Sequence, residues 1–320
     1  MDFQLDETQR EIARLAADVL GRESGTPWKA LGEAGLLALA VPERLGGDGL
    51  GVLETAVLLT EVGRRAVDVP ALATLALGVL PIARYGTDEQ QDALLPLVTE
   101  QHAVLTAALS EPSRPLPAVP ETTAGPDGIH GVKINVPYAA EARRMLVSTS
   151  SGVFVVDPAQ PEVSVLDGTV RLEGARGEIL EGADEGIRRF ALAGACAVAD
   201  GVLAGALDLT VKHVGTRHQF GKPLATFQVA AALVADVYIA SRTLHLAALT
   251  AAWSLDDHDL DTAAYWLAAE ALPAVHTCHH LHGGLGLDIT YPLHRYYGTA
   301  KELTRFVGGV EHRLGAIDVH

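Results

Sequence analysis

A cluster of prolines near the middle of the chain limits what this sequence can fold into. Five prolines fall within fifteen residues: Pro112, Pro115, Pro117, Pro120 and Pro126. Proline has no backbone N–H and its ring clashes with the preceding helical turn, so no α-helix crosses this segment. The sequence before the cluster has helical spacing, the sequence after it has strand character, and the sequence from about residue 186 is helical again. The chain therefore divides into a helical part, a small β part and a second helical part.

Apolar residues in the first hundred positions recur at helical intervals, as in the set Ile12, Leu15, Ala16 and Val19. Asp6 stands just before that set, where its side chain can cap the first turn of a helix. A glycine-rich loop at residues 41–51 lacks the Gly-Lys-Ser/Thr ending and the preceding strand of a phosphate-binding loop. We therefore interpret this loop as a connection between helices.

Two hairpins are expected after the prolines. Residues 145–147 and 153–156 are apolar and flank Ser150-Ser-Gly152, which is typical of a hairpin turn. The second hairpin has Asp167-Gly168 at its centre, a pair whose residues tolerate the positive φ angles of a tight turn. The whole β segment spans only about 75 residues.

The alanine-rich sequence that follows predicts long helices, since alanine allows neighbouring helices to approach closely. We expect one helix at about 226–253 and another at about 261–282, with Pro273 as a candidate kink. A last helix is expected from about residue 299 to the helix-ending pair Gly308-Gly309. No internal repeat is found.

These elements predict an α+β fold that is mostly α. We place an N-terminal helical domain at residues 1–109, a reduced middle β-domain at 110–183, and a C-terminal bundle of about four long helices at 184–320.

Composition excludes several classes of protein. The chain has 320 residues, with 24 Lys and Arg against 40 Asp and Glu, a net charge of −16. This charge argues against nucleic acid or an anionic membrane as a partner. Two cysteines, Cys196 and Cys278, exclude a disulfide scaffold and fit a reducing compartment. The polar, acidic start is unlike a signal peptide, and no run approaches 18 uncharged apolar residues. We expect a cytoplasmic protein.

The connection Arg217-His-Gln-Phe-Gly-Lys-Pro-Leu-Ala-Thr-Phe-Gln228 places a cation, an aromatic ring, an amide and a glycine in one short loop. Arginine can bind a phosphate through two N–H groups, phenylalanine can pack against a flat ring, and glycine allows close backbone approach. An anionic ligand with a planar ring would fit this loop. From the residues alone, an ordinary helix connection whose arginine caps a C-terminus is the favoured interpretation, and the anionic ligand is the alternative.

The segment His276-Thr-Cys-His-His-Leu-His-Gly-Gly-Leu-Gly286 contains four histidines and a cysteine. His276 and His280 share a helix face, which invites a metal site, but the cluster contains no carboxylate and no His-Glu-x-x-His pattern. We predict no metal here, and interpret the segment as a helix that ends at a tight glycine turn.

Three blocks of this sequence together resemble the acyl-CoA dehydrogenase family, in the family's order and spacing. The first runs from Val41-Pro-Glu to Glu61-Val-Gly-Arg64. The second is the Arg217–Gln228 loop, which is highly specific. The third is His282-Gly-Gly-Leu-Gly followed by Tyr291-Pro-Leu-His-Arg295. The resemblance covers nearly the whole chain and implies an N-terminal helical domain, a middle β-domain and a C-terminal four-helix bundle.

The resemblance also implies a bound FAD that two subunits share across their interface. In the family, the β-domain of one subunit holds the flavin ring, and the bundle of its neighbour holds the pyrophosphate and adenosine. His280 stands where the family usually has glutamine, and a neutral imidazole can still donate one hydrogen bond. The bundle-side residues that match the family are Arg217, Phe220, Gln228, His280, Gly283 and Gly284.

Departures from the family pattern concern the flavin ring and the catalytic base. The family's Thr-Glu-Pro-x-x-Gly-Ser flavin loop reads Ser110-Glu-Pro-Ser-Arg-Pro-Leu-Pro117 here, and prolines remove N–H donors. Gly308 stands where most members have the base, and the alternative position, at residues 189–193, holds no carboxylate. Glu311 and Asp200 are the nearest acids, and we assign neither a catalytic role.

Within the family, the chain is most similar to the small subunit of the actinobacterial two-gene acyl-CoA dehydrogenases that shorten steroid side chains, including that of cholesterol. This resemblance implies an α2β2 heterotetramer with one FAD per heterodimer, in which a catalytic partner subunit supplies the base and the flavin-ring pocket. The substrate would be a steroid with a short CoA-thioester side chain, and an electron-transfer flavoprotein would accept the electrons. Two alternatives stay open: a self-sufficient homomeric dehydrogenase with an unusual base, and a scaffold that binds no FAD.

Overall fold

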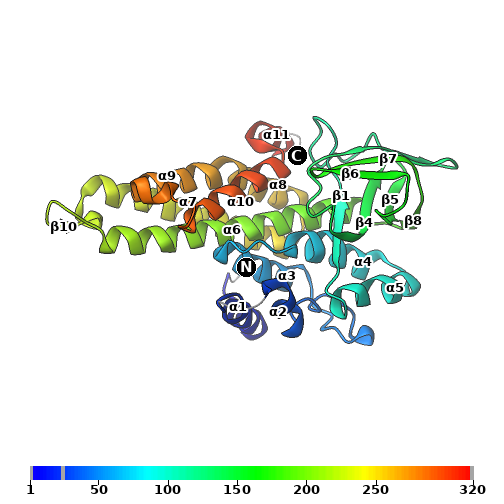
Figure 1. Ribbon diagram of the computed structural model, residues 1–320, viewed down its shortest axis with the longest axis horizontal. Coiled ribbons are helices and arrows are strands. Elements are labelled where there is room, and N and C mark those ends of the chain that lie inside the picture. The colour runs from blue at the N-terminus through cyan, green and yellow to red at the C-terminus, as the bar shows by residue number, and fades with distance from the viewer. Residues whose placement is uncertain (1–2, 23–25, 318–320) are drawn as a thin grey trace. The chain divides into compact units, whose positions relative to one another are not determined.

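The computed structural model describes residues 3–22 and 26–317 (Figure 1). Contacts between residues divide the chain into two compact units. The bundle unit comprises Met1–Ala13, Ala56–Asp68 and Ala195–His320, and the strand unit comprises Arg14–Thr55 and Val69–Gly194. The α-helices α1 (Glu7–Leu20), α3 (Val52–Arg65) and α6 (Asp184–Thr216) contribute residues to both units.

The predicted cap of α1 is confirmed by two reciprocal hydrogen bonds. The Gln9 N–H donates to the Asp6 carboxylate at 2.8 Å, and the Asp6 N–H donates to the Gln9 side-chain oxygen at 3.1 Å. The other helical segments of the strand unit are α2 (Pro27–Glu33), the 3-10 turn η1 (Glu43–Leu45), the π-helical η2 (Leu72–Val79), α4 (Leu80–Tyr85) and α5 (Asp88–Thr99).

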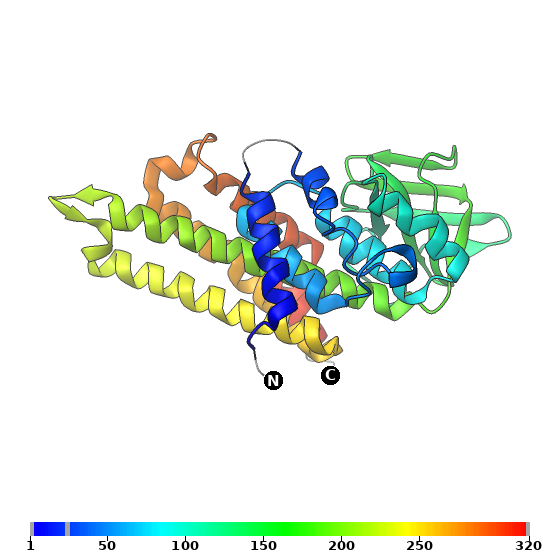
Figure 2. The same ribbon diagram turned by 90° about the horizontal axis from the view of Figure 1, so that it is seen from below.

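Two four-stranded sheets form the rest of the strand unit (Figures 1 and 2). Buried side chains of both sheets form one apolar core, which includes Met145 and Val147 of the first sheet and Val170 and Leu172 of the second. The first sheet has the order β1 (Val104–Ala108), β4 (Ala142–Thr149), β5 (Gly152–Val156) and β8 (Gly177–Leu180), with β1 parallel to β4. The second sheet is antiparallel, in the order β2 (Thr123–Gly125), β3 (Gly128–Lys133), β7 (Thr169–Ala175) and β6 (Val163–Leu166).

Both predicted hairpins are confirmed. β4 pairs with β5 across Ser150-Ser151, and β6 pairs with β7 across Asp167-Gly168. Asp167 and Gly168 have φ angles of 47° and 73°, as a tight hairpin turn of the primed type requires. Strand β1 precedes residue 110, where we had placed the start of the β-domain, so the sheet begins earlier than that position. Each compact unit combines segments from distant parts of the sequence, so the units do not test the proposed domain boundaries. These boundaries stay predictions.

The bundle unit consists of long helices that agree with the prediction in number and order. They are α6, α7 (Gln228–Ser254), the continuous stretch α8 (Asp257–Trp266), η4 (Leu267–Ala271) and α9 (Leu272–His282), and α10 (Leu293–Phe306). A kink was expected at Pro273, and the helix is distorted just before that residue, where η4 is π-helical. Figure 2 shows α6 and α7 side by side along most of their length.

In the last part of the bundle unit, one predicted boundary was wrong and one helix was missed. Helix α10 begins at Leu293, about six residues earlier than expected, and a further helix α11 (Gly309–Ile317) follows it. Gly308 and Gly309 have φ angles of 95° and 79°, so they end α10 as predicted. The same pair turns the chain into a new helix, which the pattern did not indicate.

Glycines bring the backbones of α3 and α6 into contact within the bundle unit. A Cβ on Gly201 would lie 1.9 Å from the carbonyl oxygen of Thr60, and a Cβ on Gly63 would lie 2.1 Å from that of Val198. The hydroxyl of Thr60 donates to the carbonyl of Ala197 at 3.1 Å. Side chains larger than hydrogen at these two glycines would force the helices apart.

By length and composition, helices α6 and α7 are apolar enough to cross a membrane. The sequence did not indicate this, because neither helix contains a run of 18 uncharged apolar residues. Core helices of soluble proteins pass the same test, and α6 is mostly buried inside the protein. Helix α7 is mostly exposed, and its large apolar side chains at the surface include Val229, Tyr238, Ile239, Leu246 and Trp253.

Candidate functional site

The connection between α6 and α7 folds into a small hairpin. β9 (His218–Gln219) pairs with β10 (Lys222–Pro223), and the 3-10 turn η3 (Leu224–Thr226) leads into α7. The Arg217 N–H donates to the carbonyl of His213 at 2.8 Å, and the Leu224 N–H donates to the carbonyl of Arg217 at 2.8 Å. These two bonds fix the backbone of Arg217 at the end of α6 while its side chain stays exposed.

Phe220 lies at the tip of this hairpin and is 93% exposed. Its φ is 50° and that of Gly221 is 79°, which completes the two-residue turn. Its ring meets Phe227 edge-on at 6.4 Å, and the Lys222 ammonium lies 4.5 Å from the centre of the Phe227 ring. A phenyl ring that stays in water carries a hydrophobic cost, so its position favours contact with a group outside the chain.

The glycine turn after α9 is open on its outer side. Gly283 ends α9 with a φ of 58° and starts the 3-10 turn η5 (Gly283–Leu287). A Cβ on Gly283 or Gly284 would meet no atom within 4 Å, and His280 one turn earlier is exposed. The backbone here is accessible to a ligand, which agrees with the turn that the sequence predicts.

A ring contact joins the glycine turn to the α6–α7 connection. The imidazoles of His213 and His282 stack with their centres 4.4 Å apart. His213 lies four residues before Arg217, and His282 directly precedes Gly283. Arg217, His280, Gly283 and Gly284 therefore lie within four residues of one of these two histidines, and Phe220 lies in the hairpin that follows Arg217. The sixth predicted residue, Gln228, is the exposed first residue of α7.

The histidine-rich end of α9 is held by aromatic contacts. The His276 ring stacks on Tyr297 at 5.1 Å, and the His279 ring meets Tyr297 edge-on at 5.6 Å. Among residues 3–22 and 26–317, no group of three or more His, Cys, Asp or Glu side chains is placed to hold a metal ion.

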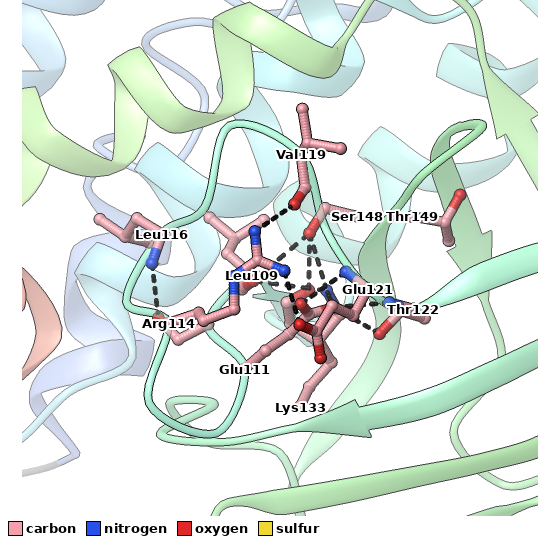
Figure 3. A network of polar contacts seen from close by, with 12 residues as sticks. Leu109, Glu111, Arg114, Leu116, Val119, Glu121, Thr122, Lys133, Ser148 and Thr149 are labelled. Carbon is pink, nitrogen blue, oxygen red and sulfur yellow. Dashed lines mark hydrogen bonds and ion pairs between the residues drawn. The ribbon is translucent and has the colours of Figure 1, made fainter.

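The loop that departs from the family pattern is closed by its own hydrogen bonds (Figure 3). Five of its N–H groups have partners inside the loop or on Glu111: those of Glu111, Arg114, Leu116, Glu121 and Thr122. Four further positions in this loop are prolines and have no N–H. Few backbone donors are therefore left for a ligand at the position where the family binds the flavin ring.

A buried ion pair anchors this loop. The Lys133 ammonium lies 2.8 Å from the Glu111 carboxylate, and both side chains are almost fully buried. Burial would raise the pKa of Glu111, but hydrogen bonds from the N–H of Glu121, from Lys133 and from Thr122 outweigh it and hold that pKa at about 2. The carboxylate is therefore charged at neutral pH and matches the Lys133 charge.

We expect Lys133→Met to lower the free energy of unfolding by about 3–5 kcal/mol, because it leaves the Glu111 carboxylate buried without its cation. The double variant Lys133→Met with Glu111→Leu should recover much of this loss. Because the pKa of Glu111 is lowered on folding, its contribution is complete above about 4.5 and is lost as the pH falls towards 2. Urea unfolding at pH 7 and pH 3 measures both effects, and equal midpoints for wild type and Lys133→Met would contradict the assignment.

A cavity of about 320 Å³ lies beside this loop in the strand unit. Its walls are the proline segment 116–120, the β4–β5 turn and the first turns of α6, which contribute Asp184 and Arg188. This volume is at the lower end of the range for ligand pockets, about 300–1,000 Å³.

The position of the expected base has no acidic side chain. Gly308 occupies the left-handed turn between α10 and α11. Asp200, one of the two nearby acids, is 3% exposed and lies 2.9 Å from the His245 ring. Glu311, the other, is exposed in the first turn of α11. Neither Asp200 nor Glu311 lines the cavity of the strand unit.

Comparison with protein families accounts for this architecture. Residues 6–102 match the acyl-CoA dehydrogenase N-terminal domain, and residues 186–317 match the acyl-CoA dehydrogenase C-terminal domain. The chain belongs to the acyl-CoA dehydrogenase family. The resemblance stated from the sequence motifs is thereby confirmed, together with the predicted fold.

Three relatives of this acyl-CoA dehydrogenase are informative. It is 45% identical to acyl-CoA dehydrogenase FadE28 of Mycobacterium tuberculosis, over 98% of this chain and 97% of that protein. The Tcur3481-Tcur3483 steroid acyl-CoA dehydrogenase variant has a TM-score of 0.91 and 32% identity, over 98% of this chain and 97% of that one. The ChsE4-ChsE5 complex of Mycobacterium tuberculosis has a TM-score of 0.90 and 29% identity, over 100% of this chain and 98% of that one. FAD complexes with the same fold have been solved.

Two features of this acyl-CoA dehydrogenase were missed from its sequence. His213 was not singled out, although it lies one helical turn before Arg217 on α6. Lys133 was not singled out either, although a lysine between Val132 and Ile134 in strand-like sequence signals a buried charge that needs a partner. Their partners are 69 and 22 residues away in the chain (282 − 213 and 133 − 111), so local patterns could not identify them.

Proposed function

We propose that this chain is the FAD-sharing subunit of a heteromeric acyl-CoA dehydrogenase that α,β-dehydrogenates a steroid CoA thioester. It pairs with a catalytic subunit, two copies of each, in the cytoplasm. The partner supplies the base, the flavin-ring pocket and most of the thioester site, and an electron-transfer flavoprotein takes the electrons. The domain boundaries at residues 110 and 184 belong to the same proposal.

The observation that carries this proposal is the contrast between the two halves of the site. At the end of the bundle unit, an arginine, an exposed phenyl ring and an open glycine turn stand ready for a ligand. In the strand unit, the loop that would hold the flavin ring is closed on itself. The base position, in the bundle unit, is Gly308 and has no carboxylate. A chain with only the first half needs a second chain to complete a site.

The residues of the bundle unit fit the dinucleotide part of FAD. When bound, FAD supplies the hydride acceptor of the dehydrogenation. The Arg217 guanidinium offers parallel N–H groups to phosphate oxygens, and Phe220 offers an apolar face. Gln228 and His280 offer further hydrogen-bond donors, and the absence of side chains at Gly283 and Gly284 allows the ligand to approach the backbone.

The relatives support the substrate class and the partner. One of the similar structures is described as a steroid acyl-CoA dehydrogenase, and another is a complex of two differently named chains. The exposed apolar side chains of α7 agree with a partner subunit, because large apolar side chains are costly to expose to water.

We expect the chain expressed alone to purify nearly colourless and without dehydrogenase activity. The loop that would hold the flavin ring is closed by its own hydrogen bonds, and the base position, Gly308, has no carboxylate. The flavin absorbance at 450 nm per mole of protein, together with acyl-CoA oxidation by an artificial acceptor, measures this. Stoichiometric FAD and turnover in the lone chain would favour the self-sufficient homomeric enzyme instead.

A further inference from the structure

The two segments that we assign to FAD are connected through a pair of histidines, of which His213 lies outside the family motifs. His213 lies in the last turn of α6, and its carbonyl accepts the hydrogen bond from the Arg217 N–H at 2.8 Å. His282 is the last residue of α9 and directly precedes Gly283. Their rings stack at 4.4 Å with an angle of 23° between their planes, so one contact spans both segments.

The hydrogen bonds of His282 are all satisfied by its neutral form. Its Nδ1 lies 2.7 Å from the Cys278 carbonyl, which only accepts, so Nδ1 carries the proton. Its Nε2 lies 3.0 Å from the Tyr291 hydroxyl, and in the neutral ring it accepts from that O–H. The ring is only 5% exposed, and both nitrogens are satisfied without a charge. Through Tyr291, the ring also ties the far end of the glycine turn to α9.

We propose that His213 and His282 are positioning residues for the FAD half-site: their stacked, uncharged rings hold the Arg217 segment and the Gly283–Gly284 turn in one arrangement, so that FAD affinity falls when the pair takes up a proton. This inference rests on the proposed function, because it concerns the same site. Neither residue needs to touch FAD.

Among the residues that the structure describes, the charged and titratable groups near the two rings do not stabilise a positive charge on either imidazole. Arg217 adds a positive charge beside His213. His279, also on α9, would repel a positive charge on His282 when it is itself charged. Cys278 contributes its carbonyl to His282, its thiol is buried, and Tyr291 contributes a neutral phenol. No carboxylate of residues 3–22 or 26–317 forms an ion pair with either ring.

The direction of the pH effect follows from these surroundings. Burial lowers the pKa of both imidazoles below the usual 6.5; the charge of Arg217 adds to this at His213, and the charge of His213 adds to it at His282. A hydrogen bond to the Cys278 carbonyl acts in the opposite direction on His282 but is the smaller effect. The ordered arrangement is therefore fully populated above about pH 6.5 and is lost as the pH falls below that value.

The test is the dissociation constant of FAD from the co-expressed complex, measured by flavin fluorescence between pH 8 and pH 5.5. We expect wild type to bind FAD about tenfold more weakly at pH 5.5 than at pH 8, since burial and the positive charge of Arg217 both disfavour a proton on the stacked pair. His213→Ala removes the stack and should weaken binding about fivefold already at pH 8. His213→Phe keeps a stacking ring without a titratable nitrogen, so it should restore binding at pH 8 and reduce the loss at pH 5.5.

A matched control is His258→Ala, which removes an exposed histidine on α8 and should leave the pH dependence unchanged. A wild-type affinity that does not vary with pH, or a His213→Phe variant with the wild-type pH dependence, would overturn the inference even if the alanine variant were poorly folded. The proposed function would survive that result as long as Arg217→Ala still weakens FAD binding. If Arg217→Ala has no effect, the proposed function fails, and this inference fails with it.

Discussion

Gly308→Glu is expected to leave turnover per heterodimer unchanged within error, although it places a carboxylate where the family has its base. The base must reach the α-carbon of a thioester that lies against a flavin, and the loop that would hold the flavin ring on this chain is closed by Glu111 and four prolines. Without an oriented substrate and a polarised carbonyl, a carboxylate has no acidic proton to remove. Gly308 also has a φ of 95°, which costs a glutamate roughly 1–3 kcal/mol of strain.

The control for this prediction is the base of the partner subunit, which we propose to be a glutamate. Replacing that residue with glutamine should lower kcat by about a hundredfold to ten-thousandfold, which is the usual contribution of a general base. Steady-state dehydrogenation by the three complexes compares the two sites directly. A near doubling of turnover with Gly308→Glu, or substantial activity in the partner variant, would mean that this subunit has a working flavin site of its own.

Arg217→Ala should weaken FAD binding by the complex tenfold to a hundredfold while the helical fold persists. A charged hydrogen bond to a phosphate typically contributes about 1.5–3 kcal/mol, and the exposed Arg217 side chain makes little contribution to the fold. FAD titration followed by fluorescence measures the affinity, and far-UV circular dichroism measures the helix content.

Arg143→Ala is a matched control, because Arg143 is also an exposed arginine but lies on β4 of the strand unit. It should bind FAD as wild type does. If Arg217→Ala retains wild-type affinity and flavin content, the α6–α7 connection faces away from the cofactor and the assignment of Phe220 and Gln228 fails as well.

Local patterns predicted most of the fold. The proline cluster located the change from helix to strand, and Asp167-Gly168 located a hairpin, because backbone restrictions act within a few residues. The same reasoning missed α11: a glycine pair ends one helix, but whether another helix starts depends on packing further away. Strand β1 was missed for a related reason, since its pairing with β4 joins residues almost forty positions apart (142 − 104 = 38).

The candidate site was predicted to the extent that it consists of motifs. The segments at Arg217–Gln228 and at Gly283–Gly284 are contiguous in sequence. The tight glycine turn is confirmed, and phosphate binding by the first segment stays a prediction. The stack of His213 on His282 and the pair of Lys133 with Glu111 join distant parts of the chain. Spacing carries no information about such contacts, and a single sequence could not reveal them.

The central claim is that this chain holds half of an FAD site and a different chain holds the other half. Native mass spectrometry of the co-expressed complex, combined with its flavin absorbance, tests this claim most directly. We predict two copies of each chain and two FAD molecules, one per heterodimer. Four FAD molecules in that complex, or a flavin-containing homotetramer of this chain alone, would contradict the account.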